Sequence, residues 1–271
     1  MLPNNVLNKI TIMGVLNMTP DSFSDGGKYT NSDAALKQAL LMIEQGANII
    51  DVGGESTRPR ASKVLVSEEL DRVIPIIEKI RLNSDVIISI DTSKPQVMQH
   101  AVSAGATLIN DVNALQEHSA IETVKNLNVD VCLMHMQGTP TTMQKSPSYS
   151  DVVNDIKVFL QNRIDCCVQA GVAREKIIID PGFGFGKTVN DNLLMLKRLE
   201  EFKSFGLAIL VGLSRKSMLA SITNRDVDLR LAGSLTLATL AVLHGATIVR
   251  VHDVAQTVDA VKVLLAMLQA K

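Results

Sequence analysis

The features that mark secreted, nucleic-acid-binding or membrane-bound proteins are scarce in this sequence. Its three cysteines, Cys132, Cys166 and Cys167, have neither paired spacing nor the density of a small disulfide-rich domain. The 27 lysines and arginines are balanced by 28 acidic residues, so there is no global basic field to attract nucleic acid or an anionic membrane. We therefore expect a cytoplasmic protein with no nucleic-acid partner and no membrane partner.

Long apolar segments are scarce as well. The stretch MLPNNVLNKI contains no apolar core of the length that a signal peptide needs. The longest apolar-rich stretch, residues 231–249, contains Ser, Thr, His and Gly residues, and we interpret it as a buried helix followed by a strand. The chain is nevertheless 46% hydrophobic over 271 residues, which allows a large core and matches the length of a single α/β barrel.

Short apolar, β-branched runs alternate with stretches of helical periodicity. The runs are residues 10–16, 47–52, 86–90, 106–110, 129–134, 176–180, 207–213 and 246–251, and the helical stretches include 33–45, 67–82, 94–104, 151–170, 190–202 and 253–268. Glycines 46, 105, 171 and 245 stand where a helix should end before the next strand. This alternation implies parallel pairing. It predicts one domain over residues 1–271, an α/β fold of the TIM-type (β/α)8 barrel class with long loops at the C-terminal face of the strands. A doubly wound open sheet is the alternative.

Polar or charged residues follow all eight of these runs. They are Asn17, Glu55 to Arg58, Asp91, Asn110 and Asp111, Met134 and His135, Asp180, Ser214 to Lys216, and Arg250 with His252. In a barrel the carboxyl ends of the strands meet on one face, where barrel enzymes place their active sites. A helix N-cap is the simpler interpretation of any single position, such as Asp91. It does not explain the set, because arginine, lysine and histidine are not capping residues.

The residue types on this face divide by chemistry. The cations Arg58, Lys216 and Arg250 suit a phosphate or diphosphate. The carboxylates of Asp91 and Asp180 can each accept two parallel N–H bonds from a nitrogen-rich heterocycle, and Asn110 can both donate to such a ring and accept from it. Asn17 offers an oxygen ligand for Mg²⁺.

The segment DPGFGFGKT, residues 180–188, resembles a nucleotide-binding glycine loop but fits neither common type. A P-loop would need glycine where Pro181 stands, and a dinucleotide fingerprint would need a third glycine where Lys187 or Val189 stands. We interpret its glycines as letting the backbone pass close to a ligand, with Phe183 and Phe185 offering rings. A plain strand-to-helix turn is the alternative. A zinc site and a Gly-x-Ser-x-Gly nucleophile elbow are both unsupported.

Nine motifs together carry a family resemblance. MGVLNMTPDSFSDGG, GGESTRP, SIDTSKP, INDV, LMHMQGTPTTM, DPGFGFGK, VGLSRKSM, GSL and RVHDV, in this order over about residues 10–265, resemble the dihydropteroate synthase family. The resemblance implies a homodimeric TIM-type barrel of folate biosynthesis. The implied transferase reaction joins 6-hydroxymethyl-7,8-dihydropterin diphosphate to 4-aminobenzoate and gives dihydropteroate and diphosphate with Mg²⁺.

The resemblance also assigns roles to residues, position by position. Asn17 would lie at the Mg²⁺–diphosphate end. The diphosphate would be held by Thr57, Arg58, Arg250 and His252, and the pterin by Asp91, Asn110, Met134, Asp180 and Lys216. Pro59, Phe185 and Ser217 would line the 4-aminobenzoate side, and Gly212 of VGLSRKSM would belong to the substrate site. One departure is Arg60, which stands where many relatives have glycine, and which puts the contacts of this loop in doubt.

The implied mechanism gives three of these residues catalytic roles. Asp91 would stabilise positive charge on the pterin ring, and Lys216 would lie between the two substrates. Phe23, in the loop of residues 17–27, would pack beside the incoming aromatic ring as that loop covers the diphosphate and excludes water. A surface turn is the alternative for this loop. Two other functions remain open: a methyltetrahydrofolate-binding methyltransferase barrel and a non-catalytic pterin-binding barrel.

Overall fold

The strands of the chain close into a parallel barrel. The computed structural model describes residues 10–18, 28–56, 63–143 and 145–270. Its strands are β1 (Thr11–Asn17), β2 (Ile49–Gly53), β3 (Ile87–Asp91), β4 (Leu108–Asp111), β5 (Asp130–Met134), β6 (Ile177–Asp180), β7 (Ala208–Val211) and β8 (Ile248–Val251). Each strand pairs in parallel with its neighbours in sequence, and β8 closes on β1. The predicted barrel is therefore confirmed, and the open sheet is wrong.

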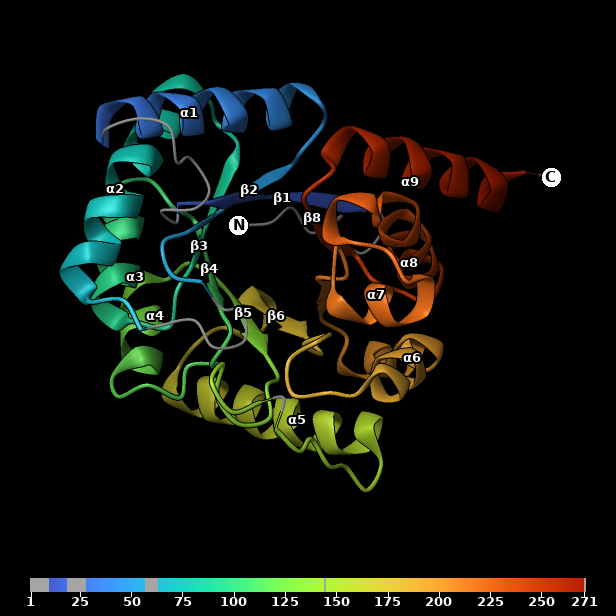
Figure 1. The fold of residues 1–271 in the computed structure, drawn as a ribbon. Helices are drawn as coiled ribbons and strands as arrows, with labels where there is room; N and C mark the ends of the chain where they lie inside the picture. The colour runs from blue at the N-terminus through green and yellow to red at the C-terminus, as the bar shows by residue number, and fades with distance from the viewer. Residues whose placement is uncertain (1–9, 19–27, 57–62, 144, 271) are drawn as a thin grey trace.

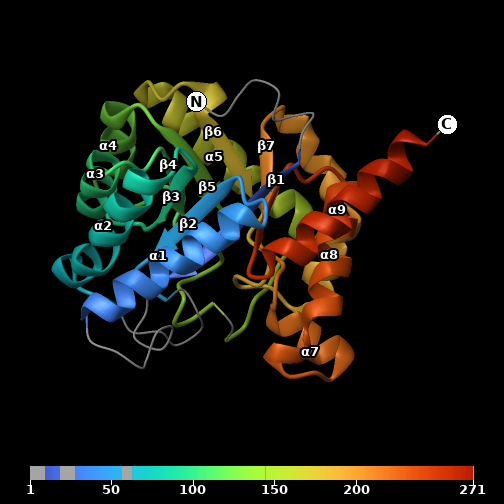
Figure 2. The same cartoon turned by 90° about the horizontal axis from the view of Figure 1, so that it is seen from above.

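Helices surround the strands on the outside of the barrel (Figures 1 and 2). They are α1 (Lys28–Glu44), α2 (Val66–Asn83), α3 (Pro95–Ser103), α4 (Ala120–Leu127), α5 (Val152–Ala170), α6 (Val189–Lys197), α7 (Ser217–Thr223), α8 (Leu231–Leu243) and α9 (Val254–Gln269), with 3₁₀ turns η3 (Arg174–Lys176), η4 (Leu199–Phe205) and η5 (Val227–Leu229). The C-terminal end of α9 projects outward from the body of the molecule in both views. Within the described residues, no helix combines the length and apolarity that a membrane crossing requires.

Side chains alternate between the barrel interior and the helix layer, as the period of a strand requires. On β2, Ile50 and Val52 belong to the large core between the strands and the helices, whereas Ile49 points inward. The inward layer is apolar and consists of Met13, Ile49, Leu108, Cys132, Ile178, Leu210 and Ile248. These side chains fill the barrel interior on the side of the N-terminal ends of the strands. The inward-facing polar groups therefore lie nearer the C-terminal ends.

The helices depart from the sequence expectation in several places, and α1 begins at Lys28, five residues before the expected start. The helix expected over residues 190–202 ends at Lys197, and η4 follows it from Leu199. Helices α4 and α7 were not expected, because eight and seven residues are too few for a clear apolar period. The apolar stretch from residue 231 forms α8 followed by β8, as expected. The glycines expected at helix ends all have positive φ, from 99° to 120°.

Candidate active site

A pocket opens at the C-terminal ends of the strands and collects most of the predicted substrate-binding residues. Its lining comes from six strands or the loops directly after them: Asp91, Asn110, Val112, Met134, Asp180, Phe183, Phe185, Gly212, Lys216 and Arg250. Residues up to 159 positions apart in the sequence thus meet in one place. This convergence is what a barrel achieves at this face.

The acidic wall of the pocket consists of Asp91, Asn110 and Asp180, which are all buried. Burial raises the pKa of Asp91 to about 7 against the lowering effect of Arg250. Burial also raises the pKa of Asp180 to about 6, although its Oδ1 accepts a 2.7 Å bond from the Gly182 N–H. Asp91 is not a helix cap, since the N-cap residue of α3 is Lys94, which has no side-chain cap bond. Both carboxyl groups line the pocket, and neither caps a helix.

Arg250 supplies the positive charge opposite this wall. Its Nε donates to Asp51 Oδ2 at 2.6 Å, and its Nη2 donates to Asp91 Oδ2 at 2.9 Å. Burial works against the charge on Arg250, but the carboxylates of Asp51 and Asp91 hold its pKa above the ordinary value. The guanidinium is thus fixed between two carboxylates, and within the described residues its other N–H groups have no acceptor, so they can bind an anion.

Lys216 forms the other cationic edge of the pocket. Its Nζ lies 4.2 Å from the centroid of the Phe185 ring. Burial and the neighbouring Arg250 charge lower the pKa of Lys216 to about 8, while Asp180 and Asp91 oppose this effect. A cation lying over an aromatic ring gives this edge both charge and a flat apolar surface.

Three further predicted residues lie around the pocket rather than in its lining. The His252 ring contacts Ser214 Oγ through Nδ1 at 3.0 Å, and burial together with Arg250 and Arg215 lowers the pKa of His252 to about 4. Ser217 is exposed at the start of α7. Asn17 is half-buried at the end of β1.

The segment after β6 is held from behind by a buried lysine. Lys187 Nζ lies 2.8 Å from the carbonyl oxygen of Gly182, 2.9 Å from that of Phe185 and 3.0 Å from His135 Nδ1. Burial lowers the pKa of Lys187 to about 7 and that of His135 to about 3. His135 also packs edge-on against Phe159. This lysine therefore fixes the backbone that presents Phe185 to the pocket.

The glycines of this segment are required by close backbone approach. Gly182 has φ +74°, and a Cβ there would lie 1.9 Å from the His135 carbonyl oxygen. Gly186 has φ +64°, and a Cβ there would lie 2.6 Å from the Gln137 carbonyl oxygen. These two glycines thus let the segment pack directly against the backbone of residues 135–137, whereas the sequence predicted close approach of this backbone to a ligand.

Several predicted site residues lie outside the described residues. They are Phe23, Thr57, Arg58 and Pro59, and the same holds for Arg60 and for residues 19–27 of the loop after β1. Two residues that sequence reasoning missed stand out instead, Asp51 and Lys187. Asp51 stands inside an apolar run but its partner Arg250 lies on another strand, and Lys187 follows a glycine-rich stretch but two of its acceptors are backbone carbonyls.

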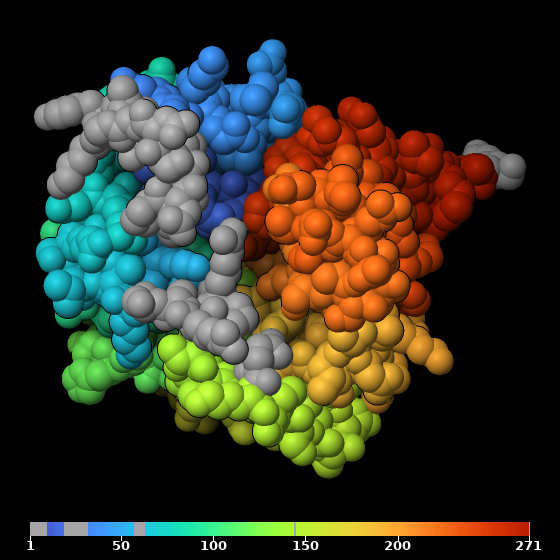
Figure 3. Space-filling model, viewed as in Figure 1, coloured from blue at the N-terminus to red at the C-terminus, as the bar shows by residue number. Residues whose placement is uncertain are grey.

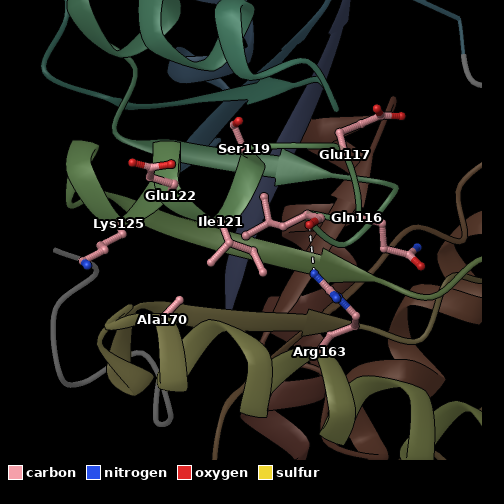
Figure 4. Close-up of a pocket in the computed structure, with 9 residues that line it drawn as sticks. Gln116, Glu117, Ser119, Ile121, Glu122, Lys125, Arg163 and Ala170 are labelled. Atoms are coloured by element: carbon pink, nitrogen blue, oxygen red, sulfur yellow. Dashed lines mark hydrogen bonds between the residues drawn. The ribbon is translucent and has the colours of Figure 1, made fainter.

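A second, wider hollow of about 680 Å³ lies on the outside of the barrel at α4 and α5 (Figure 4). Its lining carries charges of both signs, among them Glu117, Glu122 and Lys125. Arg163 in this hollow donates to the carbonyl oxygens of Ala114 and Leu115, both at 2.8 Å, so it serves the loop before α4. Since no predicted site residue lines this hollow, the chemistry points to the barrel mouth.

Comparisons with known proteins agree with this geometry. A family model described as pterin binding enzyme matches residues 13–252. The chain is 52% identical over 260 residues to the dihydropteroate synthase of Escherichia coli (strain K12), which covers 96% of this chain and 92% of that protein. The crystal structure of Yersinia pestis dihydropteroate synthase with a sulfonamide drug complex has a TM-score of 0.93 and 48% identity, over 97% of this chain and 96% of that chain.

A Xanthomonas albilineans dihydropteroate synthase with 4-aminobenzoic acid also has a TM-score of 0.93, with 45% identity over 98% of this chain and 95% of that chain. Family match, sequence identity and fold therefore agree over nearly the whole length. The chain belongs to the dihydropteroate synthase family of pterin binding enzymes.

Proposed function

We propose that this chain is a transferase that condenses 6-hydroxymethyl-7,8-dihydropterin diphosphate with 4-aminobenzoate to give 7,8-dihydropteroate and diphosphate. The observation that carries the proposal is the divided pocket at the barrel mouth. Asp91, Asn110 and Asp180 form its acidic and amide wall, and Arg250 and Lys216 form its cationic edge. A pterin presents N–H groups and ring nitrogens to the first wall, and its phosphates need the second.

The second substrate fits the edge formed by Lys216 and Phe185. The Xanthomonas albilineans relative holds 4-aminobenzoic acid. In this chain, Phe185 offers a ring face and Lys216 a cation within 4.2 Å of it. An aromatic carboxylate can stack on the ring and pair with the cation, and this supports placing 4-aminobenzoate here.

The charges of the pocket support a dissociative displacement. As diphosphate leaves, positive charge develops on the exocyclic carbon and spreads into the pterin ring. The Asp91 carboxylate stabilises this charge, and Arg250 stabilises the departing anion. The amine of 4-aminobenzoate is a weak nucleophile, so departure of the diphosphate precedes its attack. The amine then forms the new C–N bond and releases one proton.

We also propose Mg²⁺ as the metal of this reaction. A Cβ on Gly53 would lie 3.7 Å from Asp91 Oδ2 and 3.9 Å from Asn17 Oδ1, so the two oxygens flank one bare stretch of backbone. The described residues contain no cluster of three histidine, cysteine, aspartate or glutamate side chains. Such a sparse oxygen set fits Mg²⁺, which keeps several waters and binds substrate phosphates. When bound, the ion would neutralise the leaving diphosphate.

The methyltransferase alternative is disfavoured by the same groups. A methyltetrahydrofolate-binding barrel has no diphosphate to hold, whereas Arg250 lines the pocket here and is fixed by two carboxylates. The non-catalytic alternative does not account for the pKa values in the pocket. The pKa of Asp91 is raised to about 7 and that of Lys216 is lowered to about 8, and such shifts are typical of groups that take part in a reaction.

A homodimer and a cytoplasmic location complete the proposal. Large apolar side chains are exposed on α7, η5 and α8, which form one broad area of the surface (orange in Figure 3); they are Ile222, Val227, Leu229, Leu240 and Leu243. Exposed apolar side chains on these elements support contact with a second copy. The three cysteines are free, which supports a reducing compartment.

The test is a direct assay of both products. Purified protein is incubated with dihydropterin diphosphate and Mg²⁺, with and without 4-aminobenzoate, and diphosphate and dihydropteroate are quantified. We expect equimolar products when both substrates are present. Methyl transfer from methyltetrahydrofolate, or no dihydropteroate at saturating substrates, would contradict the proposal.

A further inference from the structure

A buried carboxylate lies one layer below the substrate pocket and holds two of its residues. Asp51 is on β2, and its side chain is fully buried in the barrel interior. Its Oδ2 accepts a 2.6 Å bond from Arg250 Nε on β8 and a 3.3 Å bond from Asn110 Nδ2 on β4. Asp51 does not line the substrate pocket. It therefore touches the pocket residues from beneath and not the ligand.

The contact with Asp51 decides which donors Arg250 can offer. A guanidinium carries five N–H groups in a rigid plane. One of them, on Nε, is bonded to Asp51, and one on Nη2 is bonded to Asp91. No described residue accepts from Nη1, and Arg250 lines the pocket. Because two carboxylates occupy Nε and Nη2 of this pocket residue, Nη1 is the nitrogen left to bind an anion.

The same carboxylate orients Asn110. Because one hydrogen of the Asn110 amide goes to Asp51, the amide cannot turn over without losing this bond. The Asn110 Oδ1 atom is then presented as an acceptor at the acidic wall of the pocket. Asp51 thus couples the anion-binding edge to the heterocycle-binding wall.

We infer that Asp51 is a positioning residue for the reaction: it sets the orientation of Arg250 toward the diphosphate and of Asn110 toward the pterin. This inference rests on the proposed function, since it names the two substrate groups. A purely structural role is the competing explanation, because a buried ion pair also affects folding.

The test is a double-mutant cycle of Asp51→Asn and Arg250→Ala. The probe is the monophosphate of 6-hydroxymethyl-7,8-dihydropterin, which has a poorer leaving group, and its binding is measured by calorimetry. In the otherwise unchanged protein, Asp51→Asn should weaken binding about tenfold, because a charged bond to Arg250 becomes a neutral one. In the Arg250→Ala background the same change should alter binding by less than about twofold, because the amide oxygen of the introduced asparagine can still accept the bond from Asn110.

Thermal unfolding of the four proteins supplies a second readout. Asp51→Asn should lower the midpoint when Arg250 is present. It should raise the midpoint in the Arg250→Ala background, because there the buried Asp51 carboxylate has lost its cation. A purely structural role would instead reduce binding equally in both backgrounds or leave binding unchanged in both, and either result overturns the inference.

Ser89→Ala is the matched control. Ser89 is the register neighbour of Asp51 on β3, is equally buried, and has a hydroxyl with no partner among the described residues. It should leave probe binding unchanged. The proposed function is tested separately by product formation in the unaltered protein. If that protein makes no dihydropteroate while the cycle behaves as expected, the proposed function fails and the positioning role of Asp51 stands.

Discussion

Replacing Lys187 by methionine should destabilise the protein and disturb the pocket wall at the same time. Methionine keeps the length of the stem but removes the amine that bonds the carbonyl oxygens of Gly182 and Phe185. The Gly182 carbonyl also accepts from the Phe185 N–H at 3.2 Å, so the carbonyl that loses its partner is that of Phe185, at a cost of about 1–3 kcal/mol. Relief from burying an amine offsets part of this, and we expect a net loss of about 1–2 kcal/mol in the free energy of unfolding. Urea denaturation at pH 7 measures it.

The pH dependence of the same variant separates the amine from the packing. The pKa of Lys187 is about 7 in the folded chain against its ordinary 10.5. Between these values the unfolded chain binds more protons at this amine than the folded chain. The free energy of unfolding should therefore rise with pH across this window, by at most about 1.4 kcal/mol per pH unit. The variant should lack this contribution, so its stability deficit relative to the unaltered protein should widen from pH 7 towards pH 10.

Lys197→Met is the control, since Lys197 is exposed at the end of α6 and should change stability by no more than about 0.5 kcal/mol. Two results would refute the reasoning about Lys187. One is a stability equal to that of the control variant. The other is a deficit that stays constant from pH 7 to pH 10, which would mean that the buried amine does not change its protonation in the folded chain.

The remaining predictions concern the pocket itself. Asp180→Ala should weaken binding of 6-hydroxymethyl-7,8-dihydropterin by more than about tenfold, because bonds to a carboxylate are worth about 1.5–3 kcal/mol; unchanged affinity by calorimetry would refute the assignment. Arg250→Ala should mainly raise the KM for the diphosphate substrate and spare the phosphate-free pterin, whereas Lys216→Ala should impair the use of both substrates; equal losses of the two pterins in Arg250→Ala would argue against the division of the pocket. Because burial raises the pKa of Asp91 to about 7, kcat/KM should fall as pH drops through about 7 and Asp91 gains a proton. In Asp91→Asn, any residual activity should lack this acid limb, and a limb that persists there belongs to another group.

The barrel and the upper layer of its site were predictable because both depend on local patterns. Asp91, Asn110 and Asp180 each stand at the end of an apolar run, and parallel strands bring such ends together whatever lies between them. Asp51 could not be assigned in this way. It stands inside an apolar run, and its partner Arg250 is 199 residues away, on a strand that is not its neighbour in the barrel. This pair can be predicted only when the pairing register of β2, β1 and β8 is known.

Lys187 escaped prediction for a related reason. In the sequence, Lys187 stands where a dinucleotide-binding fingerprint would need its third glycine. Two of its acceptors are backbone carbonyls, which have no signature in a sequence. The end of α6 was missed because residues 190–202 keep an apolar period through Lys197, where the helix gives way to the tighter η4. Tertiary packing, rather than helix propensity, decides such a boundary.

The two bare glycines after β6 also bear on how this protein can evolve under an inhibitor. Any side chain at Gly182 or Gly186 would collide with a backbone oxygen, at 1.9 Å and 2.6 Å respectively, and backbone cannot move aside as a flexible side chain can. Both positions have, in addition, a φ that other residues rarely adopt. A single substitution at either glycine therefore forces the backbone of this segment or of residues 135–137 to move, at a cost in stability. Compounds that draw their affinity from the backbone of residues 182–186 should select resistant variants at a lower frequency than compounds that depend on replaceable side chains.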